Sequence, residues 1–99
     1  MLYIRFEWDA TKENTNKKKH GISFREASTV FEDETAIIFD DPEHSSDEER
    51  SIILGFSNNA NLLIVCHCLR KNGSVIRIIS ARKATKKESE LYTEINNGW

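Results

Sequence analysis

The sequence is poor in the features that mark secreted, membrane-bound and disulfide-stabilised proteins. Its 99 residues include two cysteines, one proline and four glycines. Cys66 and Cys68 are two residues apart, so a bridge between them would close almost no loop, and we expect a reducing, cytoplasmic setting. No apolar run approaches the roughly 18 to 20 residues of a membrane span. The first residues also lack the basic and apolar regions of a signal peptide.

Charge is distributed very unevenly along the chain, although the formal net charge is only -2. Residues 32–49 contain nine acidic residues and no lysine or arginine, which leaves seven acidic and fourteen basic residues elsewhere. Residues 70–87 contain seven basic residues and no acidic one. This asymmetry indicates either a basic site for a polyanion beside an acidic patch, or two solvated faces that partly neutralise each other.

Apolar periodicity predicts the order of the secondary structure. Alternating residues predict five strands, over residues 2–8, 35–39, 51–56, 61–69 and 74–81. Asp9 and Gly21 mark the two ends of a first helix, and Ser23 and Thr85 open two more, each followed three residues later by glutamate. The order indicates one α+β domain over residues 1–99 with a mostly antiparallel sheet. The last helix should place Leu91, Tyr92 and Ile95 on its inner side.

The first predicted helix has a polar stripe in place of an apolar one. Trp8, Lys12, Asn16, Lys19 and His20 are spaced by three or four residues and so share one side. They are interpreted as donors aimed at phosphates or at the sheet, with His20 a candidate general acid or base. The alternative is that Asn16 and His20 pack or cap, while Lys12 is merely solvated.

Arginines accompany the last predicted strands. Arg77 lies inside an apolar run, where it must either be paired with an acid or serve a ligand. Simple alternation places Arg82 on the opposite face from Arg77, while a tight hairpin at 71–73 would bring Arg70 close. Three arginines around one hairpin could hold a phosphate by bidentate hydrogen bonds. For the ion-pair alternative, the candidate acids are Glu7, Glu26 and Glu49.

The sequence has few residues that are spaced to bind a metal ion. His67 lies between Cys66 and Cys68 on a predicted strand, and alternate strand residues face opposite ways, so the three cannot converge on one zinc ion. His67 is better interpreted as a histidine of the core or sheet surface. The acids of residues 43–49 lack the regular spacing of a calcium loop and predict a solvated loop, and His44 receives no role. We therefore expect no cofactor.

Two sequence blocks carry a resemblance to a known family. They are Phe6-Glu7-Trp8-Asp9 with Lys19-His20-Gly21-Ile22-Ser23-Phe24, and Arg77-Ile78-Ile79-Ser80-Ala81-Arg82-Lys83-Ala84. Further matching positions lie between and after them: Lys12, Asn16, Glu26-Ala27, Val30-Phe31, Asp33, Glu49-Arg50, Gly55, Arg70, Ile76, Glu88 and Tyr92. In this order and over nearly the whole chain, they resemble the BrnT family of bacterial toxins.

The resemblance implies a RelE-like fold and a type II toxin that cuts RNA and arrests translation. It implies a hetero-oligomer with a BrnA-like antitoxin, a ribbon-helix-helix protein through which the complex would bind operator DNA. Messenger RNA, free or on the ribosome, would be the substrate. The overall acidity departs from the basic character common in RelE-like ribonucleases.

A metal-independent ribonuclease needs a base, an acid and cations, because the 2′-hydroxyl of RNA is the nucleophile. The residues assigned to catalysis are Arg77, Arg82, His20 and Tyr92, and those assigned to RNA binding are Lys12, Lys19, Arg70 and Lys83. The arginines would stabilise the phosphorane, and His20 or Tyr92 would transfer protons. Competing hypotheses are a non-catalytic binding subunit that uses the same arginines as contacts, and a metal-dependent hydrolase built on the acidic loop.

Overall fold

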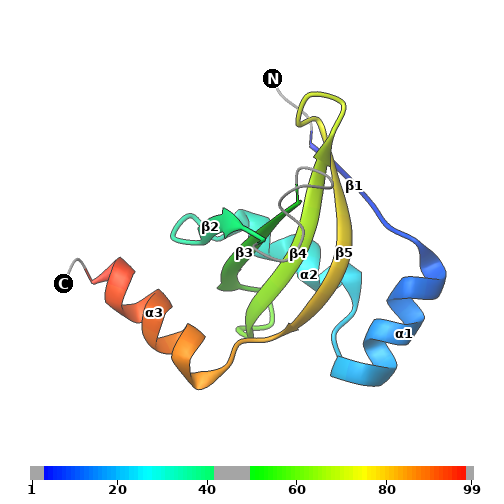
Figure 1. Ribbon diagram of the computed structural model, residues 1–99. Coiled ribbons are helices and arrows are strands. Elements are labelled where there is room, and N and C mark those ends of the chain that lie inside the picture. Colours follow the sequence, from blue (N-terminus) through cyan, green and yellow to red (C-terminus); the bar gives the residue numbers. More distant parts are fainter. Residues whose placement is uncertain (1–3, 42–49, 98–99) are drawn as a thin grey trace.

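In the part of the chain that the structure describes, five strands and three α-helices follow one another in the predicted order, and Figure 1 shows their arrangement. The computed structural model describes residues 4–41 and 50–97. The elements are β1 (Arg5–Glu7), α1 (Ala10–His20), α2 (Phe24–Ser28), the 3₁₀ turn η1 (Thr29–Glu32), β2 (Ile37–Asp40), β3 (Arg50–Phe56), β4 (Leu62–Arg70), β5 (Val75–Lys83) and α3 (Lys86–Asn96). The predicted α+β class is confirmed. The acidic loop, with His44 and Glu49, lies outside the described residues.

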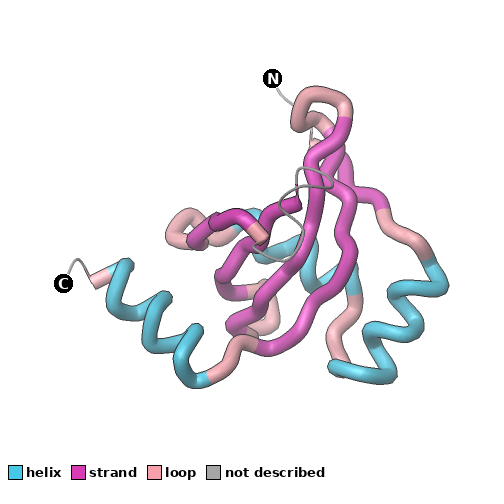
Figure 2. Tube along the Cα trace, viewed as in Figure 1, coloured by secondary structure: helices cyan, strands magenta, loops and turns pink. Residues whose placement is uncertain are grey.

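The strands form one sheet in the order β1-β5-β4-β3-β2. Strand β1 runs parallel to β5, and the other neighbours are antiparallel. Strand β1 is only three residues long, so it flanks β5 as far as Arg77 and no further. Helix α1 runs beside β5 beyond that point (Figure 2). This arrangement puts the polar stripe of α1 along the edge of the sheet.

Local capping signals account for most helix ends. Asp9 accepts a hydrogen bond from the Lys12 amide, and Gly21 ends α1 with a φ of 73°, in the left-handed region that favours glycine. Thr85 and Glu88 form the predicted capping box of α3. At α2 only half of the box forms: the Glu26 carboxylate instead binds other residues, Ser57 and Asn61 of the β3–β4 connection.

The core lies between α2, η1 and one face of the sheet. We call this face the core face; its strand residues in the buried cluster are Ile53, Leu63, Val65, Ile78 and Ala81. Phe24, Ala27 and Val30 cover it from the helical side. Gly55 of β3 allows Ala36 and Val30 to pack closely against the sheet. A Cβ at Gly55 would lie 2.8 Å from the Ala36 Cβ and 3.0 Å from Val30 Cγ1.

A β-bulge reverses the alternation in the middle of β5. Cys66 pairs with Ser80 but His67 pairs with Ile78, which leaves Ile79 as the extra residue. Arg77 pairs with Cys68 and Arg82 pairs with Ile64, so both arginines point to the side opposite the core face. The expectation that they lie on opposite faces is therefore wrong. We call the side that carries Arg70, Arg77 and Arg82 the arginine face.

Helix α3 packs against one end of the arginine face, through Glu88 and Tyr92. Leu91 and Ile95, expected on the inner side, are 40% and 52% exposed. The helix has no buried residue, and the polar contacts of Glu88 and Tyr92 and the ring contact of Tyr92 attach it to the sheet side. No helix in the described ranges is long and apolar enough to cross a membrane.

Candidate nucleic-acid interface

A carboxylate holds two arginines together at one end of the arginine face. Arg77 Nη1 donates to Glu7 Oε2 at 3.0 Å, and Arg70 Nε lies 3.8 Å from the same oxygen. Glu7 faces Arg77 because parallel pairing of β1 with β5 puts the two residues in register. Phe6 turns the other way, into the core, where its ring centroid is 5.4 Å from that of Phe31. Of the two candidate acids that the structure describes, Glu7 is the partner of Arg77, whereas Glu26 binds Ser57 and Asn61.

Arg50 lies in the same row of the sheet as Glu7 and Arg77. Registers across three strand pairs place Glu7, Arg77, Cys68 and Arg50 in one row across the sheet. We call these four residues the arginine row. Sequence reasoning assigned Arg50 no role of its own, because it follows an acidic segment and begins a strand with no apolar neighbours before it. Only the register of β3 against β4 reveals where it lies.

Beside the arginine row, Cys66 is a shielded thiol. Its Sγ donates to Asp41 Oδ2 at 3.4 Å, and Asp41 is 6% exposed. Burial and the neighbouring Asp41 carboxylate raise the pKa of the Cys66 thiol to about 11. Cys66 is therefore a thiol at neutral pH and is not suited to act as a nucleophile.

Arg82 occupies a second position on the arginine face. It forms a bidentate pair with Glu88 of α3, with distances of 2.8 Å from Nη1 to Oε1 and 2.9 Å from Nη2 to Oε2. These hydrogen bonds lower the pKa of Glu88 to about 2. The β4 partners of Arg77 and Arg82, Cys68 and Ile64, are four residues apart, roughly 13 Å along the strand. The two guanidinium groups therefore occupy separate places.

A pocket of about 280 Å³ lies between α1 and the bulged part of β5. Its lining residues are Thr11, Lys12, Thr15, Asn16, Lys19, His20, Ile79 and Ser80. We call it the α1 pocket. It gathers the lysines and the histidine of the predicted stripe, so their shared orientation is confirmed. Asn16 is buried and used structurally: its carboxamide binds the Ala81 backbone and the Ile22 carbonyl.

Tyr92 lies far from the arginine row. Its hydroxyl donates to Asp33 Oδ2 at 2.9 Å and is 2.6 Å from Thr35 Oγ1. Burial and the Asp33 carboxylate raise its pKa. Phe56, whose ring is in edge contact with that of Tyr92, is six residues along β3 from Arg50, roughly 20 Å away. Tyr92 thus anchors α3 at the opposite end of the face.

His67 is a core residue, as interpreted from the sequence. It is buried, its ring lies edge-on to Phe31 with centroids 4.8 Å apart, and its Nδ1 is 3.2 Å from the Val65 carbonyl. Burial lowers its pKa. Across residues 4–41 and 50–97, no three histidine, cysteine or acidic side chains gather to hold a metal ion.

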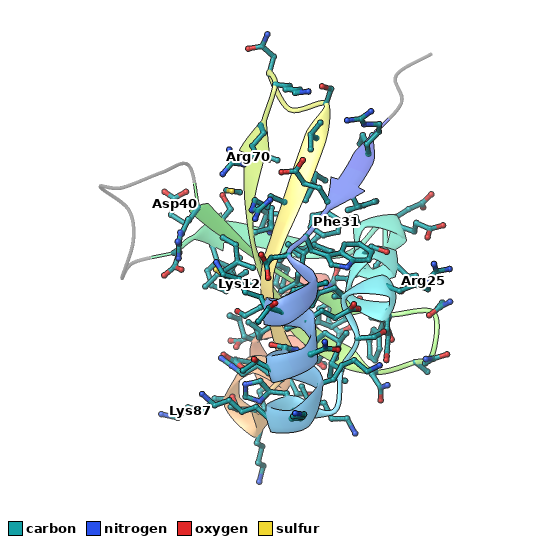
Figure 3. The ribbon with its side chains drawn as sticks, turned by 90° about the vertical axis from the view of Figure 1, so that its right-hand side faces the viewer. Lys12, Arg25, Phe31, Asp40, Arg70 and Lys87 are labelled. Atoms are coloured by element: carbon teal, nitrogen blue, oxygen red, sulfur yellow. The ribbon has the colours of Figure 1, made fainter. Side chains whose placement is uncertain are left out.

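The predicted site residues thus fall into four places. Arg70 and Arg77 share Glu7, and Lys12, Lys19 and His20 share the α1 pocket. Arg82 is on the arginine face farther along β5, and Tyr92 is beneath α3. Lys83 pairs with Leu63, a core-face residue, and its charge acts on Glu26. Arg70 and Lys87 lie on one side of α1 in Figure 3, and Arg25 and Phe31 on the other.

An edge lined by arginines, lysines and hydroxyl groups on a small α+β fold suits the phosphates of a nucleic acid. The family model described as "Ribonuclease toxin, BrnT, of type II toxin-antitoxin system" matches residues 8–88. The class of this protein is therefore that of the ribonuclease toxins of type II toxin–antitoxin systems. The chain belongs to the BrnT family.

A solved structure supports the fold. The crystal structure of the Brucella abortus ribonuclease toxin BrnT superposes with a TM-score of 0.63 at 24% sequence identity. The match covers 87% of this chain and all of that one. No curated protein matches the sequence. The α+β architecture with three helices and a mostly antiparallel sheet is therefore shared with a BrnT toxin.

Proposed function

We propose that this chain is an endoribonuclease toxin that cleaves messenger RNA without a metal ion and so arrests translation in the cytoplasm. A BrnA-like ribbon-helix-helix antitoxin would neutralise it in a hetero-oligomer and carry the contact with operator DNA. The family supports the ribonuclease activity and the existence of an antitoxin partner. The resemblance supports translation arrest and the ribbon-helix-helix antitoxin, and the cationic residues of the site support cleavage without a metal ion.

One observation carries the proposal: cationic groups follow β5 from one end to the other. Arg70 and Arg77 meet at its start, the α1 pocket adds Lys12 and Lys19 at its bulge, and Arg82 lies near its end. Cations in series along one edge match the repeated phosphates of a single RNA strand. The net charge of -2 does not prevent this, because the acidic residues are concentrated elsewhere in the sequence.

Roles follow from these positions. Arg77, supported by Arg70, would bind the scissile phosphate and stabilise the charge of the phosphorane. Arg82 and the α1 pocket would bind neighbouring phosphates. His20, in the α1 pocket, is the better placed of the two predicted proton-transfer residues, because the hydroxyl of Tyr92 is engaged by Asp33. Lys83, on the core face, would reach RNA only beyond the end of β5.

The test is cleavage of total RNA by the purified chain in EDTA. Arg77→Ala should abolish cleavage and growth arrest while leaving the circular dichroism spectrum unchanged. Arg25→Ala is the matched control, because Arg25 is an exposed arginine of α2 on the other side of the molecule. A folded Arg77→Ala protein that still cleaves would remove Arg77 from the mechanism, and activity that EDTA abolishes would show a need for metal.

A non-catalytic binding subunit is the alternative function. It is favoured by the ion pairs of Arg77 and Arg82, since both arginines already have carboxylate partners within the chain. In that case the arginines would contact antitoxin or ribosome. Salt-sensitive RNA binding without cleavage products, with or without translating ribosomes, would identify this function.

A further inference from the structure

We propose that Glu7 is the general base of the cleavage reaction and takes the proton from the attacking 2′-hydroxyl of RNA. This inference rests on the proposed ribonuclease function. It assigns a catalytic role to a carboxylate that sequence reasoning treated only as a candidate ion-pair partner for arginine.

Glu7 is a carboxylate placed where a phosphate would bind. Its Oε2 is 3.0 Å from Arg77 Nη1 and 3.8 Å from Arg70 Nε, while Oε1 takes part in neither contact. A phosphate bound by these arginines would lie beside the carboxylate, and its adjoining 2′-hydroxyl would be within reach of Oε1. The guanidinium of Arg77 has donors other than Nη1 to offer that phosphate.

Accessibility separates Glu7 from the other acids of the arginine face. The Glu7 side chain is 39% exposed. Asp41 is buried and accepts from Cys66, and Glu88 uses both oxygens for Arg82. Among the described residues of this face, Glu7 is therefore the carboxylate that both meets an arginine cluster and can be reached by a substrate hydroxyl.

The pairing also gives the base a fixed position. Glu7 is in register with Arg77 on a strand whose preceding residue, Phe6, packs into the core. A carboxylate positioned by a strand and two guanidinium groups loses little freedom when substrate binds. Removal of the proton from the 2′-hydroxyl would leave Glu7 neutral as charge grows on the phosphorane, so both arginines could turn their charge to the phosphate.

The step balances with solvent water as its one further participant. Glu7 accepts the proton as the 2′-oxygen forms a bond to phosphorus and the bond from phosphorus to the 5′-oxygen breaks. The departing 5′-oxygen takes a proton from water, and Glu7 returns its proton to the hydroxide left behind. The products are a 2′,3′-cyclic phosphate and a 5′-hydroxyl end.

The experiment compares wild type, Glu7→Gln, Glu7→Asp and Glu94→Gln on one RNA oligonucleotide in EDTA. Glu7→Gln keeps size and hydrogen bonding but cannot accept the proton, so kcat should fall by about 100-fold or more, with KM within a few-fold. Glu94→Gln removes the same charge at an exposed position of α3 and should behave as wild type. Glu7→Asp should retain part of the activity, and circular dichroism reports folding in each case.

The pH profile separates a base from a merely structural ion pair. Among the described residues, the titratable or charged groups in the same or adjoining registers of the arginine face around Glu7 are Arg77, Arg50, Cys68, Arg70, Arg5 and Cys66. Wild type and Glu7→Gln should differ in the shape of their pH–rate profiles. The Glu7→Gln rate should keep rising with pH because hydroxide must replace the missing base.

The outcomes of this experiment are distinct. A wild-type chain that does not cleave RNA, even with ribosomes, overturns the proposed function itself. A wild type that cleaves together with a folded Glu7→Gln protein of equal kcat and pH profile overturns only the role of Glu7. A substrate with a single 2′-deoxy nucleotide at the cleavage site has no 2′-hydroxyl there. Its cleavage to products that end in 3′-phosphate would also refute the role of Glu7.

Discussion

The carboxamide of Asn16 pairs with the backbone of Ala81 as a neighbouring strand would. Ala81 N donates to Asn16 Oδ1 at 3.1 Å, and Asn16 Nδ2 donates to the Ala81 carbonyl at 2.8 Å. Strand β1 has ended before this point, so one side chain of α1 satisfies two backbone groups on the edge of β5. A third bond, to the Ile22 carbonyl at 3.0 Å, secures the turn after α1.

Replacement of Asn16 by alanine should lower the free energy of unfolding by roughly 2 to 4 kcal/mol, because it leaves buried backbone groups without partners. Urea unfolding at pH 7 measures the loss. Asn14→Ala, on the exposed side of the same helix, is the matched control and should change stability by less than about 0.5 kcal/mol. Equal effects of the two substitutions would refute the pairing.

The polar stripe of α1 shows which features of the site local sequence can predict. The spacing of Lys12, Asn16 and His20 places them on one side of a helix, because an α-helix repeats about every 3.6 residues whatever its sequence. The partner of Asn16 is 65 residues away, and no local pattern indicates it. The sequence therefore predicts that these residues share one side of α1. It does not predict that Asn16 is structural while its cationic neighbours line a pocket.

The arginines show a second limit. The proximity of Arg70 and Arg77 follows from the hairpin, and Glu7 was among the predicted acidic partners. The face of Arg82 was predicted wrongly, because one extra residue at Ile79 shifts every later side chain of β5 to the other side. A bulge depends on the register between two strands, and the alternation of one strand does not reveal it.

Gly55 should be intolerant of a side chain. Gly55→Ala would put a Cβ 2.8 Å from the Ala36 Cβ and 3.0 Å from Asp33 Oδ2. We expect a loss of roughly 1 to 3 kcal/mol in the free energy of unfolding, since β2 or η1 must move. Thermal and urea unfolding measure it. Adding Ala36→Gly should restore part of the stability, and a double variant no more stable than Gly55→Ala would argue against this contact.

The pair between Arg82 and Glu88 should stabilise the protein at neutral pH and lose its effect in acid. The native pKa of Glu88 is about 2, below its usual 4.5, so the stabilisation is present above 4.5 and disappears as pH falls towards 2. Glu88→Gln should lower the free energy of unfolding by roughly 1 kcal/mol at pH 7. This loss is smaller than the pKa shift implies, because the Arg82 side chain is 40% exposed and solvent screens the pair.

Urea unfolding at pH 7, 5 and 3 measures this difference. Wild type and Glu88→Gln should converge in stability as the pH is lowered, and glutamine preserves the N3 position of the capping box. Glu90→Gln on the same helix is the control and should run parallel to wild type. A difference between wild type and Glu88→Gln that is constant over this range would contradict the assignment.

Tyr92 should act mainly as the anchor of α3. Tyr92→Phe keeps the edge contact with Phe56, whose ring centroid is 5.2 Å away, but removes the donor to Asp33. We expect a loss of about 1 kcal/mol at pH 7. Because the native pKa of Tyr92 is raised, its contribution is complete below the usual value of 10 and is lost as pH rises beyond it. Wild type and Tyr92→Phe should therefore converge in alkali.

A double-mutant cycle with Asp33→Asn isolates the contact. Asp33 also accepts from the Phe56 and Thr35 amides, so Asp33→Asn alone should cost more than Tyr92→Phe alone. The two changes should couple by about 1 kcal/mol in the free energy of unfolding. If they are additive instead, the Tyr92 hydroxyl is not held by Asp33, and Tyr92 regains its place beside His20 as a candidate for proton transfer.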